Sequence, residues 1–176
     1  AQDHYLSSLK SSPRSQTSIN GCIHFFIEQG LNGEEINVFL NKNGVQLKEN
    51  ENFYLQLADS VNVSIDSNIS FSLIGIDPRS TMQKSINNYG CYEPLMVKKI
   101  LKNVRETDIV YDIGAHIGYY SSIFNKVTKS KEVVSLEPDF YSSNLIKRNT
   151  NERGIVVNKF IGSKSGYLSL IHISEP

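Results

Sequence analysis

Apolar runs alternate with helix-like segments in the second half of the chain, and this alternation constrains the fold more than any other feature of the sequence. Three short apolar runs are typical of buried strands, and a segment of helical length follows each of the first two. Strands that alternate with helices in this way pair in parallel and are joined by right-handed crossovers. The sequence therefore predicts an α/β fold with strands at 109–113, 132–136 and 155–161 and helices at 118–127 and 141–149.

The turn after the first predicted strand combines an acid with two glycines. It reads DIGAHIG, from Asp112 to Gly118. In an open parallel sheet, ligands bind beyond the carboxyl ends of the strands, and glycines there let the backbone pass close to a ligand. N–H groups at the start of the next helix favour a polar or anionic group, whereas Asp112 would repel a pyrophosphate and attract an amine or a cation. The turn therefore favours a ligand with a ribose, an amine, a carboxylate and a positive centre over a dinucleotide.

A second acid ends the next predicted strand, at Glu137-Pro138. A carboxylate at this position can accept two hydrogen bonds from a ribose diol, each worth roughly 1.5–3 kcal/mol. Dinucleotide-binding folds use an acid in the same way, so Glu137 indicates a nucleoside and leaves the cofactor open. The glycine turn separates the alternatives. A dinucleotide fingerprint is G-x-G-x-x-G, and this chain has Ala115 and His116 where the middle glycine is expected.

Together, D-I-G-A-H-I-G and V-S-L-E-P resemble the first two motifs of class I S-adenosylmethionine-dependent methyltransferases, and the finer resemblance is to the FkbM-type family. Members of that family carry a D-x-G-A-x-x-G-Y-Y/F-like segment, a strand that ends in Glu-Pro and a following helix with Leu and Asn, here Leu145 and Asn149. A Tyr-Glu pair shortly before the first motif also matches, here Tyr92-Glu93. The resemblance covers about residues 87–168 and implies a partial cofactor-binding domain with a Rossmann-like parallel sheet, truncated after its first three strands.

The resemblance also implies an activity and a set of site residues. The cofactor would be S-adenosyl-L-methionine, and its methyl group would pass to a hydroxyl of a sugar or another small molecule. Glu137 would hold the ribose, and the glycine turn would line the methionine end of the cofactor, at Asp112, Gly114, Ala115 and Gly118. The full set of expected cofactor-binding residues is Glu93, Asp112, Gly114, Ala115, His116, Gly118, Glu137 and Pro138.

His116 stands where the family often has Asn, so a side-chain contact to the cofactor is not implied there. A general base at His116 is the less favoured interpretation, because a loop histidine at a helix start is more often a packing or capping group. Tyr119 and Tyr120 are expected to be wall and core aromatics. The sequence does not indicate which residue is the catalytic base.

The first half of the chain has a different pattern. Residues 1–33 are expected to form a variable N-terminal segment. Within it, residues 1–20 are polar and serine-rich, so a short helix at most is predicted there, and a short apolar run from Ile23 to Gln29 is closed by Gly30 and Gly33. Residues 34–80 predict a β-rich appendage, because stretches within it alternate apolar and polar residues and Asn43-Gly44 is typical of a tight hairpin turn. Strands of this appendage are predicted at 34–40, 45–47, 53–57, 61–65 and 69–73. A helix is then predicted to begin at Pro94, whose fixed φ suits the first helical position.

Composition argues against several classes of partner. The formal net charge is zero, so the chain has no basic footprint for nucleic acid or for an acidic membrane surface. No apolar run approaches the roughly 18 residues of a membrane-spanning helix, and the first residues lack the order of a signal peptide. Cys22 and Cys91 lie far apart and the histidines are scattered, so we expect buried or free thiols, no metal site and a cytoplasmic location. The expected partner is a small-molecule or glycan acceptor, and the oligomeric state is not indicated.

Two alternative functions remain open. The first is an NAD-dependent oxidoreductase, against which the missing middle glycine argues. The second is a non-enzymatic β-rich binding module that uses residues 34–75 to bind a carbohydrate or a protein. This module can coexist with a methyltransferase half, to which it would present the acceptor.

Both ends of the chain are expected to be cut. The family resemblance calls for a fourth strand with an I-K-I-D-x-E-G-like motif, and the sequence stops before it. We therefore expect a fragment that is itself inactive, with an unpaired sheet edge where the fourth strand belongs. The tail at 169–176 reads SLIHISEP, which resembles a translated sequencing adapter, and is expected to be foreign to the gene.

Overall fold

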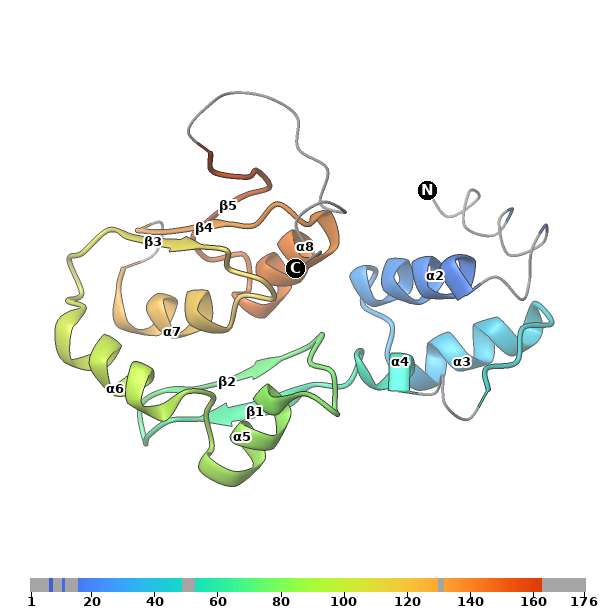
Figure 1. The fold of residues 1–176 in the computed structure, drawn as a ribbon, viewed down its shortest axis with the longest axis horizontal. Helices are drawn as coiled ribbons and strands as arrows, with labels where there is room; N and C mark the ends of the chain where they lie inside the picture. The colour runs from blue at the N-terminus through green and yellow to red at the C-terminus, as the bar shows by residue number, and fades with distance from the viewer. Residues whose placement is uncertain (1–6, 8–10, 12–15, 49–52, 130–131, 163–176) are drawn as a thin grey trace.

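The computed structural model describes residues 7, 11, 16–48, 53–129 and 132–162. It is a mixed α/β structure with two small sheets (Figure 1). The helices are α2 (Gln16–Glu28), α3 (Gly33–Lys42), α4 (Phe53–Gln56), α5 (Thr81–Tyr89), α6 (Pro94–Asn103), α7 (Tyr119–Val127) and α8 (Phe140–Asn149). The strands are β1 (Val61–Ser64), β2 (Ser70–Leu73), β3 (Val110–Ile113), β4 (Val133–Leu136) and β5 (Ile155–Val157).

The second sheet is parallel, with strand order β3-β4-β5, as the alternation of the sequence predicts. Its register aligns Ile113, Leu136 and Val157 across the three strands. The last strand is shorter than predicted, because the chain leaves the ladder after Val157. There the side-chain amide of Asn158 donates to the carbonyl of Glu137 at 2.9 Å and takes the place of a further ladder bond.

Helices α7 and α8 lie on one side of the parallel sheet, and the hairpin of β1 and β2 lies beyond them together with α5 (Figure 1). Ile123 of α7 and Leu145 and Ile146 of α8 are fully buried in this arrangement. On β3, by contrast, Tyr111 and Ile113 are 64% and 66% exposed. Parallel sheets are normally covered on both faces, so one face of this sheet is unusually open.

A continuous core connects the two halves of the chain. Buried residues from α2 to the start of α8 belong to a single cluster, which includes Ile23, Leu73 and Leu145. Asn149 adds a polar link at its edge. Its Oδ1 accepts from the Ile74 N–H at 2.9 Å, and its Nδ2 donates to the Ile117 carbonyl at 2.7 Å. The N-terminal half therefore packs on the same helices that support the glycine turn.

The predicted strand at 34–40 is wrong, because this segment is helix α3. Asn32 and Glu35 form a capping box, in which each side chain accepts from the other residue's N–H at 3.0 and 2.9 Å. Ile36 and Leu40 are one helical turn apart and are both fully buried. This spacing and the cap outweigh the alternation that suggested a strand.

The predicted hairpin at Asn43-Gly44 is also wrong. Asn43 is the C-cap of α3, and Gly44 has a φ of 76°, so the pair ends a helix where a hairpin turn was expected. The strand predicted at 53–57 is replaced by the single turn α4. Only the last two strands of the predicted appendage form, as the antiparallel pair β1 and β2.

The predicted polar segment at the N-terminus contains a longer helix than expected. In α2, Ile19, Cys22, Ile23, Phe26 and Ile27 recur at helical spacing and are buried. Residues 1–6, 8–10 and 12–15 of this segment lie outside the described residues, as does the predicted tail at 169–176. Helix α2 therefore belongs to the core.

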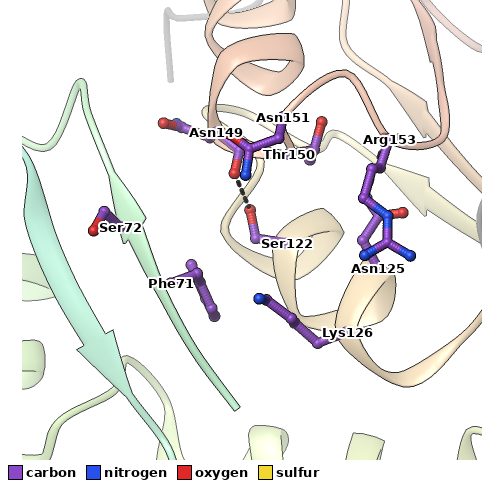
Figure 2. Close-up of a pocket in the computed structure, with 9 residues that line it drawn as sticks. All are labelled: Phe71, Ser72, Ser122, Asn125, Lys126, Asn149, Thr150, Asn151 and Arg153. Carbon is purple, nitrogen blue, oxygen red and sulfur yellow. Dashed lines mark hydrogen bonds between the residues drawn. The ribbon is translucent and has the colours of Figure 1, made fainter.

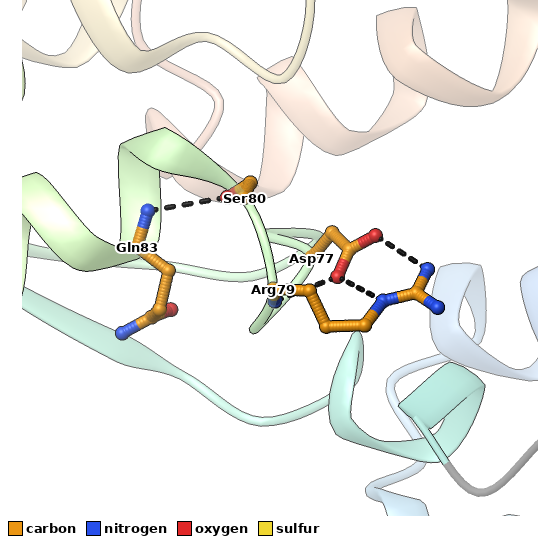
Figure 3. A network of polar contacts seen from close by, with 4 residues as sticks. All are labelled: Asp77, Arg79, Ser80 and Gln83. Atoms are coloured by element: carbon orange, nitrogen blue, oxygen red, sulfur yellow. Dashed lines mark hydrogen bonds and ion pairs between the residues drawn. The ribbon is translucent and has the colours of Figure 1, made fainter. Parts of the chain in front are cut away.

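Helix α5 was not predicted, although its start has clear local signals (Figure 3). The Asp77 carboxylate accepts from the backbone N–H and the guanidinium of Arg79, at 2.8 to 3.0 Å, and closes a tight turn after β2. Ser80 then caps the helix, because its Oγ accepts from the Gln83 N–H at 3.1 Å. Helix α6 begins at Pro94 as predicted.

Cys22 and Cys91 are buried free thiols, as expected, and burial raises the pKa of the Cys22 thiol to about 11. Across the described part of the chain, no helix combines the length and the apolar character needed to cross a membrane.

Candidate functional site

The carboxyl ends of β3 and β4 lie side by side, and the glycine turn is bonded to both. Asp112 pairs with Ser135 in the sheet register. The N–H groups of Gly114 and Ala115 both donate to the Leu136 carbonyl, at 2.9 and 3.1 Å. The acid at the end of β3 and the acid just after β4 therefore occupy the same edge of the sheet, as the sequence predicts.

Glu137 holds the turn in place. Its Oε2 accepts from the backbone N–H of His116 at 2.8 Å, and its Oε1 accepts from the N–H of Asp139 at 2.9 Å. The residue is only 8% exposed. An ionised carboxylate has about four acceptor positions on its two oxygens. Two of them remain for a hydroxyl pair, so Glu137 can both shape the turn and accept from a diol.

His116 takes part through its backbone. Its φ of 51° is left-handed, a conformation that non-glycine residues adopt rarely and mainly at turns. The residue is exposed, while its N–H is directed at Glu137. The sequence suggested a packing or capping role as the ordinary one for this histidine, and a link from its backbone to the neighbouring strand was not foreseen.

Asp112 is half-buried and hydrogen-bonded to the first turn of α7. The Ser121 hydroxyl donates to its Oδ2 at 2.6 Å and lies 2.7 Å from the hydroxyl of Ser135. Burial raises the pKa of the Asp112 carboxyl above its ordinary value, the bond from Ser121 opposes this shift, and the charge of Glu137 adds to it. The neighbouring charge of Glu137 therefore disfavours the ionised form of Asp112, and a nearby amine or cation would favour it.

Sequence reasoning missed Ser121 and Ser135. Both are buried, at 0% and 2% exposure, although serine is usually found at the surface. The signal was available in part, because Ser135 interrupts the apolar run VVSL. Only the pairing of β3 with β4 reveals that the two hydroxyls meet at Asp112.

The two glycines of the turn have different roles. Gly118 has a φ of 86°, and a Cβ there would lie 3.2 Å from Cα of Ile146, so this glycine lets α7 approach α8. Gly114 has a φ of 75°, and a Cβ there would meet no atom within 4 Å. No atom of the described residues therefore covers the side of Gly114 where a Cβ would lie, and a ligand can approach the backbone there. Ala115, between them, is 7% exposed and packs inward.

Glu93 lies at the start of α6 with a strained backbone. Its φ of 48° is left-handed, and its side chain makes no capping bond. The Tyr120 hydroxyl donates to Glu93 Oε2 instead, which links α6 to the first turn of α7. Strained non-glycine residues concentrate at functional sites. Beside Glu93 is a cavity of about 370 Å³, lined also by Pro94, Leu95, Met96 and Lys99.

The remaining predicted residues are structural in this arrangement. Pro138 is half-buried, and its carbonyl accepts from Asn158 at 2.9 Å. Tyr119 is 3% exposed, and its hydroxyl bonds the backbone N–H and carbonyl of Tyr92 at 2.9 and 2.8 Å. Leu145 is in the core, and Asn149 links the turn to β2 as described above. Among the residues that the structure describes, no group of three or more His, Cys, Asp or Glu side chains could hold a metal ion.

Comparisons with protein-family models, with curated proteins and with solved structures found no match for this chain. What the site can do is therefore argued from its own geometry.

Proposed function

We propose that this chain carries the Rossmann-like cofactor domain of an S-adenosylmethionine-dependent methyltransferase that acts on a hydroxyl of a sugar or another small molecule. The main support is the meeting of Asp112 and Glu137 at adjoining strand ends, across a glycine turn whose backbone is bare at Gly114. Two facing acids disfavour a pyrophosphate and suit a ligand that carries an amine and a positive centre.

The residues present fit such a ligand. Glu137 has free acceptor positions for the two ribose hydroxyls. The hydrogen bonds that it accepts from the backbone N–H groups of His116 and Asp139 hold its side chain in one orientation before a ligand binds. Asp112, oriented by Ser121, would supply the negative charge that pairs with an ammonium group. When bound, the cofactor would supply an activated methyl group. The residues of the site would align that methyl group. Their hydrogen bonds would keep the side chains of Asp112 and Glu137 in place while the cofactor binds.

Glu93 is the described residue best placed to extend the site toward an acceptor. Its bond from Tyr120 sets it at the start of α7, and the adjoining cavity has apolar walls at Leu95 and Met96. The proton released by the acceptor hydroxyl needs a base, and no described residue is assigned that role.

The alternative functions have less support. An oxidoreductase would need a bare backbone at the middle position of the turn, where Ala115 packs inward. The hypothesis of a β-rich binding module was based on strands predicted within residues 34–75, and much of this segment is helical.

Calorimetric titration of the full 176-residue chain with S-adenosylhomocysteine, and separately with NADH, tests the proposal. Binding of S-adenosylhomocysteine is expected, and Gly114→Ala should weaken it about tenfold, because overpacking a contact costs about 1–3 kcal/mol. Gly44→Ala is the matched control. Gly44 has a φ of 76°, like the 75° of Gly114, and a Cβ at either would meet nothing within 4 Å.

The control variant should keep the native affinity, since it has the same backbone strain far from the site. Binding of NADH alone would favour the oxidoreductase. An equal loss in both glycine variants, or no binding of either S-adenosylhomocysteine or NADH, would refute the proposed site.

A further inference from the structure

A second cavity lies along the side of α7 that faces β2 (Figure 2). Its volume is about 320 Å³, within the usual range of small-molecule pockets. It opens between β2, represented by Phe71 and Ser72, and the C-terminal ends of α7 and α8. Its lining includes none of the residues of the site at the strand ends, although Ser122 and Asn149 of its wall donate to the carbonyls of Gly118 and Ile117. The occupant inferred below does not depend on the proposed function.

Two cations line this cavity without a counter-charge. Lys126 and Arg153 are both exposed, and within the described ranges neither forms an ion pair. None of the nine described residues that line the cavity is acidic. In Figure 2 the Lys126 ammonium is directed toward Phe71. The charge of the wall therefore favours an anion.

The neutral polar groups of the wall favour hydrogen-bond donors. The Ser122 hydroxyl donates to the Gly118 carbonyl at 2.8 Å, and the Thr150 hydroxyl donates to the Ile146 carbonyl at 2.8 Å. Each hydroxyl therefore donates its single hydrogen within the protein and can only accept a further hydrogen bond from a ligand. A ligand that meets these oxygens must bring hydrogens of its own.

Asn125 gives the clearest sign that a partner is missing. The residue is 5% exposed, and its Oδ1 is buried without a hydrogen-bond partner in the described structure. Its Nδ2 donates to the Arg153 carbonyl at 3.2 Å, which sets the orientation of the amide. A buried acceptor left unpaired costs about 1–3 kcal/mol. Because Asn125 lines the cavity, a ligand that brings a donor to Oδ1 would remove that cost.

We infer that this cavity binds a small anion that also carries hydroxyl groups, of the chemical class of a sugar phosphate. The anionic group lies against Lys126 and Arg153. The hydroxyl groups donate to Asn125 and to the serine and threonine oxygens, and the ring of Phe71 covers the less polar side of the ligand.

Glucose 6-phosphate is a suitable probe, with glucose and inorganic phosphate as its two halves. Each is titrated into the full chain and followed by amide chemical shifts. Glucose 6-phosphate is expected to bind with a dissociation constant below about 10 mM, at least about tenfold more tightly than either half. The shifted amides should include Asn125, Lys126 and Arg153 and should not include Gly114.

Variants then test the role of the charges. The double variant Lys126→Gln/Arg153→Gln should lower the affinity by about tenfold or more, since a hydrogen bond to a charged group contributes about 1.5–3 kcal/mol. Lys102→Gln is the matched control, because Lys102 is the basic residue in the last turn of α6 as Lys126 is in the last turn of α7. Circular dichroism checks that each variant is folded.

Three outcomes would overturn the inference. Phosphate that binds as tightly as glucose 6-phosphate would mean an adventitious ion only. An affinity unchanged in the folded double variant, or lowered equally by Lys102→Gln, would remove the two cations from the site. Absence of binding at about 10 mM would exclude this class of ligand. The Gly114→Ala variant should bind glucose 6-phosphate normally, which separates this result from the test of the proposed function.

Discussion

Replacing Glu137 with alanine should destabilise the fold as well as weaken binding of the proposed cofactor. The carboxylate accepts two backbone N–H bonds, from His116 at 2.8 Å and from Asp139 at 2.9 Å, and the residue is 8% exposed. Each hydrogen bond to a charged group contributes about 1.5–3 kcal/mol, and water can reach the freed N–H groups only in part. Because neighbouring bonds are not additive, we expect Glu137→Ala to lower the free energy of unfolding by about 2–4 kcal/mol.

Glu137→Gln should have an intermediate effect. The glutamine side chain has a single acceptor oxygen, so its amide nitrogen would face one of the two N–H groups. The expected loss is about 1–2 kcal/mol, which corresponds to one lost bond and a donor that faces a donor.

Urea unfolding followed by circular dichroism measures these changes. Glu106→Ala is the control, because the side chain of Glu106 is 72% exposed and lies 4.0 Å from Lys129 in a surface pair. Its effect should stay within about 0.5 kcal/mol. A Glu137→Ala variant as stable as the control would refute the geometry argued for the turn, and any ligand contact of Glu137 would then need a different explanation.

Three further predictions concern the glycines, the core and the buried acid. In urea unfolding, Gly118→Ala should lower the free energy of unfolding by about 2–4 kcal/mol and Gly114→Ala by about 1–2 kcal/mol. Both glycines adopt a positive φ, but only at Gly118 would a Cβ meet Ile146. Equal losses in the two variants would contradict this explanation. Ile123→Ala should cost about 2–5 kcal/mol in thermal unfolding, whereas Ile113→Ala, at 66% exposure, should cost less than about 1 kcal/mol. The Asp112→Asn variant should gain stability relative to the native chain as the pH rises above 3.8. Because the pKa of Asp112 is raised in the folded state, folding favours the protonated carboxyl, and the native chain loses stability as this carboxyl ionises. Urea midpoints from acid to neutral pH would show the gap widening, and a constant gap would show that Asp112 is not desolvated.

Much of the second half of the chain could be predicted because its signals are local. Asp139 caps α8, accepting from the Ser142 N–H at 2.7 Å, and Pro94 starts α6. Each signal acts within one turn of its own residue, so it can be read without knowing the rest of the fold.

The errors in the first half came from short apolar runs. The stretch EINVFL reads as a strand by alternation, but Ile36 and Leu40 also have helical spacing. Runs of this length fit either period, and length and caps must decide between them. The capping residues Asn32 and Glu35 are present in the sequence, and with the helical spacing of Ile36 and Leu40 they decide for the helix.

The sequence by itself determined the order of strands and helices after Pro94 and the placing of two acids at neighbouring strand ends. Only the tertiary structure decided what those acids contact, which is the N–H of His116 for Glu137 and the hydroxyl of Ser121 for Asp112. The structure likewise decided that Asn149 bonds the backbone of Ile74. The physical reason is range. Caps and periodicity act between residues a few positions apart, whereas these polar contacts join segments that meet only after the strands have paired and the helices have packed.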